Sequence, residues 1–84
     1  MFKAKINITL RESILDVQGK TIEHALHSLE YQNLNHVRIG KYVEINVTAV
    51  SPEAAYESVS SACSKLIANP IIEDYYINIE EISE

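Results

Sequence analysis

The side chains best suited to metal binding in this sequence are its three histidines. His24 and His27 lie three residues apart on a predicted helix, a spacing at which two imidazoles can share one metal ion. His36 falls on the following segment, and nothing in the sequence brings a third ligand close to the pair. We therefore expect these histidines to be exposed or at an interface, and we predict no metal site.

A nucleophile and a phosphate-binding arginine are the other chemistries to consider. Cys63 would need a histidine beside it and an oxyanion-binding turn, but its surroundings, SSACSKL, contain no glycine. Because it borders the apolar stripe of a predicted helix, we expect a small buried side chain. Arg11 follows the first predicted strand, where a small phosphatase would bind phosphate, yet RESILD lacks the glycines of a phosphate loop. No acid-base pair of carboxylates stands out, so the residues predict no active site.

The start of the first predicted helix is unusual. Asp16 suits the N-cap, but Gly19 then falls in the first turn, at a cost of about 1 kcal/mol relative to alanine. A residue without a Cβ allows close backbone contact, here with a partner subunit or with the preceding strand, and Gln18 and Lys20 offer hydrogen bonds beside it. The alternative is that Gly19 only relieves crowding at the turn. The apolar stripe of this helix consists of Ile22, Ala25, Leu26 and Leu29.

Size and composition limit the possible functions. The 84 residues predict a single domain, residues 1–84, whose small core favours an oligomer. The apolar fraction of 46% is that of a folded globular protein, and the formal net charge of −5 argues against general binding to nucleic acid. A single cysteine excludes an internal disulfide, and MFKAKINITL resembles neither a signal peptide nor a membrane span. We expect a cytoplasmic protein with no membrane partner.

Hydrophobic periodicity predicts six elements that position these residues. Alternation predicts strands over 2–10, 43–49 and 75–79, and a short strand over 37–39 that a Gly40-Lys41 turn joins to the next strand as a hairpin. The helices are predicted from Asp16 to near Asn33, and from Ser51 to the Asn69-Pro70 stop. This order predicts the α+β class: a βαββαβ ferredoxin-like two-layer sandwich with an antiparallel sheet and two helices on one face.

The faces of these elements follow from the same patterns. The second helix buries a stripe made of Ala55, Val59, Ala62 and Leu66, with Cys63 at its edge. The sheet face without helices is polar but carries Tyr42 and Tyr76, which suit contact with a protein partner because tyrosine gives contact area at low entropic cost. A solvated face is the alternative. Its other members are Lys3, Lys5, Asn7, Thr9, Glu44, Asn46, Thr48 and Asn78.

Three motifs together resemble the PurS family, the small subunit of bacterial and archaeal phosphoribosylformylglycinamidine synthase. They are LDVQGKTIEHALHSLEY, VRIGKYVEI and KLIANPIIEDYYI, and they occur in the family's order over nearly the whole chain. The family typically opens the helix with Asp-Pro-Gln-Gly, whereas Val17 stands here in the proline position. That departure reduces rigidity at the helix entry but leaves Asp16, Gln18, Gly19 and Lys20 in place.

The resemblance implies a non-catalytic adaptor in purine (IMP) biosynthesis. In such a complex a glutaminase subunit of the PurQ type releases ammonia, and a synthetase subunit of the PurL type uses ATP and Mg²⁺ to make formylglycinamidine ribonucleotide. PurS-like chains join the two as dimers or dimers of dimers, and this chain would bind no cofactor itself. The partner-interface residues that we predict are Asp16, Gln18, Gly19, Lys20, Arg38, Lys41, Tyr42, Asn69 and Tyr76.

Two further expectations also have open alternatives. Arg38 and Lys41, beside the predicted hairpin turn, either meet an acidic patch on a partner or are exposed basic side chains without one. For the whole chain, the alternative function is a ferredoxin-like domain that senses an amino acid at a dimer interface, which would require a small-molecule pocket.

Overall fold

The computed structural model describes residues 1–82 and contains three strands and two α-helices. The final residues of the predicted domain, Ser83 and Glu84, lie outside this range. The α+β class with an antiparallel sheet is confirmed. In chain order the elements are β1 (Phe2–Leu10), α1 (Val17–Ser28), β2 (Gly40–Val47), α2 (Pro52–Ala62), the π-helical turn η1 (Cys63–Ile67) and β3 (Glu73–Glu81).

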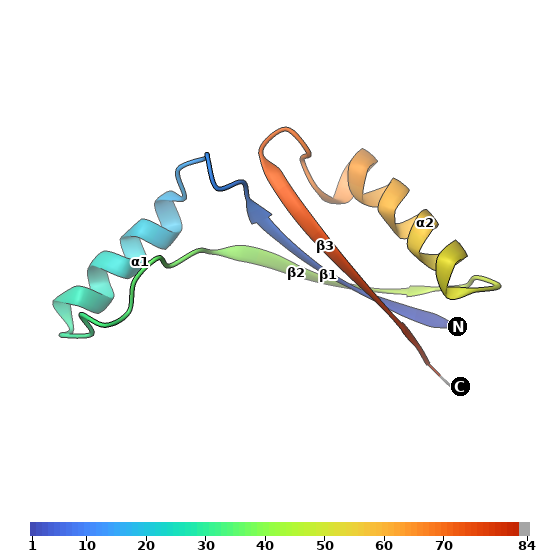
Figure 1. Ribbon diagram of the computed structural model, residues 1–84, viewed down its shortest axis with the longest axis horizontal. Coiled ribbons are helices and arrows are strands. Elements are labelled where there is room, and N and C mark those ends of the chain that lie inside the picture. Colours follow the sequence, from blue (N-terminus) through green and yellow to red (C-terminus); the bar gives the residue numbers. More distant parts are fainter. Residues whose placement is uncertain (83–84) are drawn as a thin grey trace.

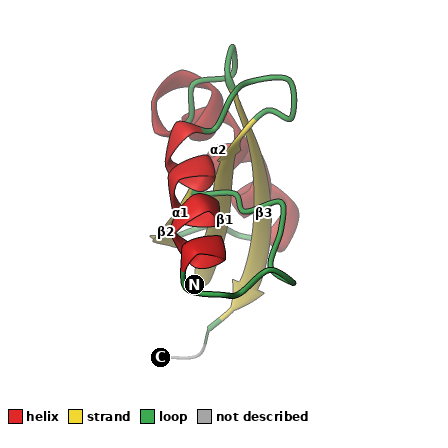
Figure 2. Ribbon diagram, turned by 90° about the vertical axis from the view of Figure 1, so that its left-hand side faces the viewer, coloured by secondary structure: helices red, strands yellow, loops and turns green. Residues whose placement is uncertain are grey.

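The sheet is built around β1, which pairs antiparallel with β2 on one side and β3 on the other. Its alternating pattern gives one buried face, where Ile6 lies opposite Val43 and Ile77. Helix α2 packs on this face against β1 and β3 (Figure 1). The three strands lie side by side when the molecule is viewed from its end (Figure 2). On the opposite face, which we call the outer face of the sheet, no helix of residues 1–82 packs.

The core lies between β1 and α2. Ile6, Ile8 and Cys63 are its largest fully buried side chains. Along α2 and η1 the buried stripe advances by four residues, from Ala55 and Val59 on α2 to Cys63 on η1, and Ile67 continues it against the core. The predicted stripe was therefore wrong at its C-terminal half: Ala62 is exposed and Leu66 is 86% exposed. Part of this shift comes from η1. A π-helix has more residues per turn than an α-helix, so side chains after Cys63 lie at a different position around the helix axis than an α-helix would give them.

The first helix does not lie on the sheet, so the prediction of two helices on one face is wrong for this chain. α1 and the segment that returns beside it, residues 29–39, extend away from the sheet as a helical arm, residues 17–39 (Figure 1). We call residues 29–39 the returning segment. With the arm extended, the molecule is 50 Å long and 14 Å thick. Of the helix residues only Gly19 is buried.

The predicted short strand over 37–39 and its hairpin turn are also wrong. β2 begins at Gly40, directly opposite Thr9, and the preceding residues lie along α1 instead of pairing in the sheet. The amides of Val37 and Ile39 donate instead to Glu23 on α1 and to Asp16, the N-cap of α1, which is why they do not form a fourth strand. Gly40 is needed for a close approach and not for a turn, because a Cβ there would lie 2.4 Å from the carbonyl oxygen of Ile8.

Helix α1 ends five residues before the predicted stop at Asn33. Glu30 adopts a left-handed conformation with φ of 73°, and the amide of Tyr31 donates to the carbonyl of Leu26. This is the hydrogen-bond pattern of a Schellman C-cap, in which the left-handed position is usually glycine. A glutamate in that position gives no sequence signal, so the periodicity alone overestimated the helix.

Candidate interaction sites

Two carboxylates of the α1 region hold the arm together. Asp16 caps the helix by accepting from the Gly19 amide at 2.9 Å through Oδ1, and it accepts from the Ile39 amide at 2.7 Å through Oδ2. About two turns further along, Glu23 Oε1 accepts from the Val37 amide at 3.1 Å. We call Asp16 and Glu23 the carboxylate latch. The latch accepts hydrogen bonds from the backbone amides of Val37 and Ile39, which lie on one edge of the returning segment.

The electrostatics of the latch agree with this geometry. The pKa of Asp16 is lowered, mainly because its carboxylate accepts from the Gly19 amide and then from that of Ile39. The pKa of Glu23 is lowered chiefly by the hydrogen bond from Val37. Both carboxylates therefore favour the ionised form, which is the form able to accept these hydrogen bonds.

The close packing of the returning segment against α1 also explains why residue 19 is a glycine. A Cβ on Gly19 would lie 2.3 Å from the carbonyl oxygen of Val37 and 2.7 Å from Oδ2 of Asp16. Its φ is not positive, so the site needs the missing side chain and not an unusual backbone conformation. The close approach that we expected is present within the chain, but the neighbour is the segment that follows the helix instead of the preceding strand.

The apolar stripe of α1 is mostly exposed. Ile22 is 41% exposed and Leu29 is 67% exposed, while Ala25 is also exposed and Leu26 is half-buried. We call Ile22, Ala25 and Leu29 the apolar side of the arm. The groove beside it, with a volume of about 310 Å³, is lined by Val17, Gln18, Thr21, Ile22 and Ile39. A contiguous exposed apolar surface of this kind is typical of a protein-protein contact.

The base of the arm is fastened by basic side chains. Arg38 donates to the carbonyl of Leu10 and to Glu12 Oε1, the latter at 3.0 Å. Lys41 Nζ lies 3.4 Å from Glu73 Oε2. Arg38 and Lys41 are thus paired with acids of their own chain, a possibility that neither alternative from the sequence included.

The last loop is also held internally. Arg11 donates to the carbonyl of Pro70 and pairs with Asp74 at 3.6 Å, so the candidate phosphate-binding arginine has structural partners. Asn69 closes the turn before β3: its Oδ1 accepts from the Ile71 amide at 3.1 Å, and its own amide donates to Glu73 at 2.8 Å. The hydrogen bond from Asn69 is the main reason that the pKa of Glu73 is lowered.

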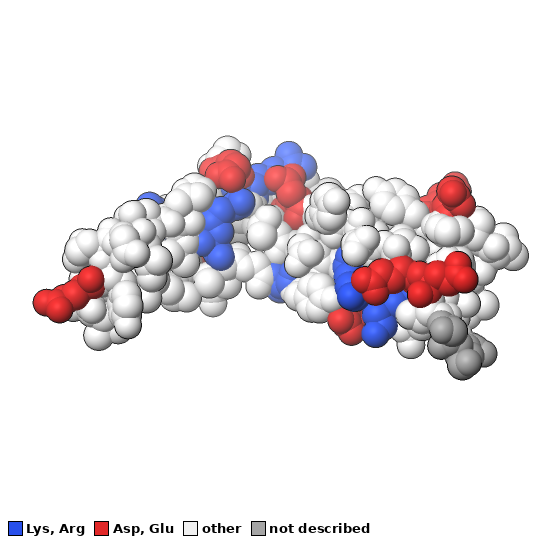
Figure 3. Space-filling model, turned by 60° about the horizontal axis from the view of Figure 1, so that its bottom comes forward, with Lys and Arg blue, Asp and Glu red and all other residues white. Residues whose placement is uncertain are grey.

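The outer face of the sheet carries a row of Tyr42, Asn7 and Tyr76, in register across the three strands. Tyr76 is 72% exposed. Next to this row acids pair with lysines: Lys5 bonds Glu80 at 2.8 Å, and Lys3 lies 3.9 Å from Glu44, which also accepts from the Tyr42 hydroxyl at 2.8 Å. Figure 3, which brings this side forward, shows basic and acidic atoms adjacent near the termini, while much of the arm is uncharged.

Of the side chains considered for catalysis or metal binding, Cys63 and His27 make contacts within the fold. Cys63 is fully buried, and burial raises the pKa of its thiol. His27 Nε2 lies 2.8 Å from the carbonyl oxygen of Leu34, to which the ring N–H donates, whereas His24 is exposed. Within residues 1–82 no three His, Cys, Asp or Glu side chains come together as a metal site would require.

Sequence reasoning missed Glu12 and Glu23, which together with Asp16 organise the arm. A signal for Glu23 was present, since it follows Asp16 by seven residues and therefore lies on the same side of the helix. Glu12 had no such signal, because it lies in a loop and its partner Arg38 is 26 residues away.

Comparison with known proteins agrees with the fold and with the motifs. The family model PurS, described as phosphoribosylformylglycinamidine (FGAM) synthase, matches residues 3–81. The Bacillus subtilis PurS subunit of that synthase is 44% identical over 82 residues, 98% of this chain and 96% of the relative. No helix within residues 1–82 has the length and hydrophobicity needed to span a membrane.

Solved structures give the same result. PurS from Methanocaldococcus jannaschii superimposes with a TM-score of 0.89 at 37% identity, covering 99% of this chain and all of that one. A chain of the PurLQS structure from Thermotoga maritima superimposes with a TM-score of 0.87 at 34% identity, covering 94% and 96% of the two chains. The chain described here therefore belongs to the PurS family of phosphoribosylformylglycinamidine synthase.

Proposed function

We propose that this chain is the non-catalytic PurS subunit of a phosphoribosylformylglycinamidine synthase in purine biosynthesis. In the complex it joins a glutaminase subunit of the PurQ type to a synthetase subunit of the PurL type, so that ammonia passes from one to the other. ATP and Mg²⁺ belong to the synthetase, and the assembly works in the cytoplasm. Family membership and the PurLQS relative support this role.

The observation that carries the proposal is the helical arm. The carboxylate latch ties α1 to the segment that returns beside it, and the apolar side of the arm is uncovered. The candidate chemical groups, by contrast, are used inside the fold: Cys63 is buried and Arg11 is paired with Asp74. The surface that this chain offers is thus suited to holding other proteins.

We infer that the apolar side of the arm contacts a second copy of the chain. Helix α2 covers β1 and β3, whereas Val43, Ile45 and Val47 on β2 are only half-buried on the same face of the sheet. The apolar side of a second copy's arm can pack on these half-buried side chains of β2. A two-fold axis lets each copy cover the other in the same way. The outer face of the sheet, with Tyr42 and Tyr76, then stays available for an enzyme subunit.

Assembly of the complex tests the proposed role. We expect sedimentation velocity to show one species that contains synthetase, glutaminase and this chain when all three are mixed with ATP, Mg²⁺ and glutamine. Without the chain, or with an unrelated ferredoxin-like domain of similar size and charge in its place, the two enzymes should sediment separately. If the enzymes form the same complex without the chain, the adaptor role is contradicted.

A further inference from the structure

The helical arm meets the sheet only at its base. Helix α2 packs on β1 and β3, whereas α1 packs along none of the strands in residues 1–82 (Figure 1). The chain crosses between arm and sheet twice, through residues 11–16 before α1 and between Ile39 and Gly40 at the start of β2. A hollow of about 260 Å³ lies at this junction, with Gln18 and Lys41 among its lining residues. Apolar packing therefore contributes little to the direction in which the arm leaves the sheet.

The hydrogen-bond ladder of the sheet stops short of the arm. Thr9 lies opposite Gly40, so continued pairing of β1 with β2 would bring Leu10 opposite Ile39. The amide of Ile39 donates instead to Asp16 Oδ2 at 2.7 Å, inside the arm. Leu10 and Ile39 thus do not extend the ladder, and the carbonyl oxygen of Leu10 accepts from a side chain.

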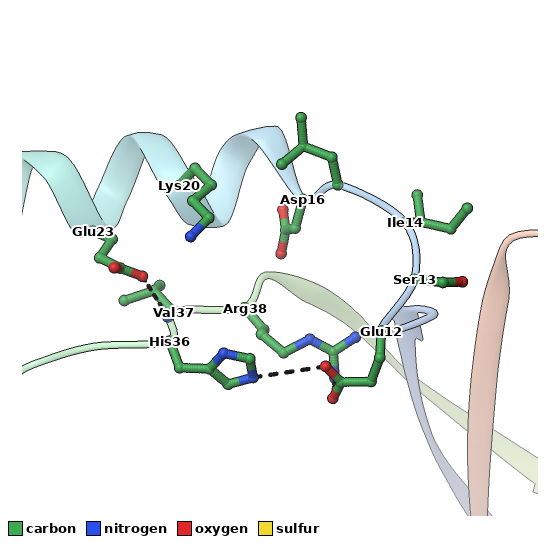
Figure 4. A pocket seen from close by; sticks show the side chains of 10 residues that line it. Glu12, Ser13, Ile14, Asp16, Lys20, Glu23, His36, Val37 and Arg38 are labelled. Carbon is green, nitrogen blue, oxygen red and sulfur yellow. Dashed lines mark hydrogen bonds and ion pairs between the residues drawn. The ribbon is translucent and has the colours of Figure 1, made fainter.

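That side chain is Arg38, on the returning segment. Its guanidinium donates to the carbonyl oxygen of Leu10 at the end of β1 and to Glu12 Oε1 at 3.0 Å. Figure 4 shows Arg38 reaching from the returning segment toward Glu12 on the loop before α1. The side chain of Arg38 is 28% exposed and that of Glu12 is 70% exposed, so solvent screens their ion pair and the bond to Leu10 is the better protected of the two.

The other polar contacts near the base do not replace Arg38. His36 Nε2 lies 3.8 Å from Glu12 Oε2, but both side chains are largely exposed, so this contact is weak. Lys41 pairs with Glu73, and both residues belong to the sheet. The latch joins α1 to the returning segment and so lies within the arm. Among residues 1–82, Arg38 is therefore the side chain that hydrogen-bonds the arm directly to a strand.

We propose that Arg38 is a positioning residue: by bonding Leu10 and Glu12 together, it sets the direction of the helical arm relative to the sheet. Without its guanidinium the latch still folds the arm, but the arm turns about the two chain crossings at its base. An arm that already points in the binding direction loses less conformational freedom on association, so Arg38 strengthens association by preorganisation. This last step rests on the proposed function, whereas the positioning itself concerns a single chain.

A distance between arm and sheet tests the positioning on the full chain. Nitroxide labels are attached at Ser28→Cys, at the far end of α1, and at Asn78→Cys on β3, which are both exposed, while the fully buried Cys63 takes no label. The chain carries Ile22→Glu, so that no second copy holds the arm, and is diluted with unlabelled chain. We expect double electron-electron resonance to show that Arg38→Gln broadens the distance distribution about twofold, and that Arg38→Lys, which lacks the planar fork, broadens it less.

Arg11→Gln is the matched control. Arg11 makes the same kinds of contact, to a carbonyl of the last loop and to Asp74, but it does not bond the arm. We expect its distance distribution to be as narrow as that of the parent chain. Hydrogen exchange at the Val37 and Ile39 amides should stay slow in Arg38→Gln, because the latch remains closed. If Arg38→Gln is as narrow as Arg11→Gln, or broadens only with loss of protection at these amides, Arg38 does not position a folded arm.

Association gives a separate readout, with Ile22 retained and no labels. We expect sedimentation equilibrium to show that Arg38→Gln raises the dissociation constant of the homodimer about tenfold, and that Arg11→Gln changes it less than about twofold. If the distance distribution broadens and the dissociation constant does not change, the positioning stands and the arm is not the dimer contact. If the distribution does not broaden, the positioning is wrong whatever happens to the dimer.

Discussion

Gly19→Ala is expected to lower the free energy of unfolding by about 2 kcal/mol and the Tm by roughly 10 °C. The new methyl group would lie 2.3 Å from the carbonyl oxygen of Val37, and since that atom belongs to the backbone, the helix and the returning segment must separate. Separation lengthens the hydrogen bonds from Ile39 to Asp16 and from Val37 to Glu23. The better helix propensity of alanine, about 1 kcal/mol, offsets only part of this loss.

The matched control is Thr21→Ala, two residues further along the same helix. Thr21 is exposed and its hydroxyl bonds only the carbonyl of Val17, within the same turn. We expect its free energy of unfolding to stay within about 0.5 kcal/mol of wild type. Circular dichroism melts at equal protein concentration compare the three proteins. A Gly19→Ala chain as stable as the Thr21→Ala chain would show that the Val37 contact does not constrain this site.

Ile22→Glu is expected to raise the dissociation constant of the homodimer on the order of 100-fold. Ile22 belongs to the apolar side of the arm, lines the groove beside it and is 41% exposed in the single chain. If a second copy covers it, the glutamate would place a charge without a partner in an apolar contact, which costs several kcal/mol. Sedimentation equilibrium over a range of concentrations measures the change.

His24→Glu controls for the added charge. His24 is exposed on the same helix, about 200° from Ile22 around the axis, and donates no side-chain hydrogen bond in residues 1–82 that the glutamate would remove. Its dimer should dissociate at nearly the wild-type concentration. Equal weakening by both variants would mean that net charge controls association, and the arm would then not be the dimer contact.

Local patterns predicted those parts of the fold that local physics determines. Alternation located β1 and β3, Ser51 and Pro52 marked the start of α2, and Asp16 was identified as the N-cap of α1. In each case the signal and its cause lie within a few residues of each other. The exposed pairing of Tyr42 and Tyr76 with Asn7 follows from the same alternation once the strands are in register.

The position of α1 could not be predicted in this way. A periodic apolar stripe shows that a helix has an apolar face, but it does not show which surface covers that face, or whether that surface belongs to the same chain. The sequence of the returning segment predicts a strand because Val37 and Ile39 alternate with polar residues. In the structure their amides instead donate to Glu23 and Asp16 of the latch. Gly19 was recognised as unusual, yet its neighbour is 18 residues away in sequence.

Coupling between the two enzymes tests the central claim most directly. Synthesis of formylglycinamidine ribonucleotide would be measured with the synthetase and glutaminase subunits, with and without this chain, using either glutamine or ammonia as the nitrogen source. We predict that the chain raises the glutamine-dependent rate on the order of tenfold or more, because it holds the two sites in proximity, and leaves the ammonia-dependent rate unchanged. If the chain changes neither rate, or raises both equally, it is not the coupling subunit.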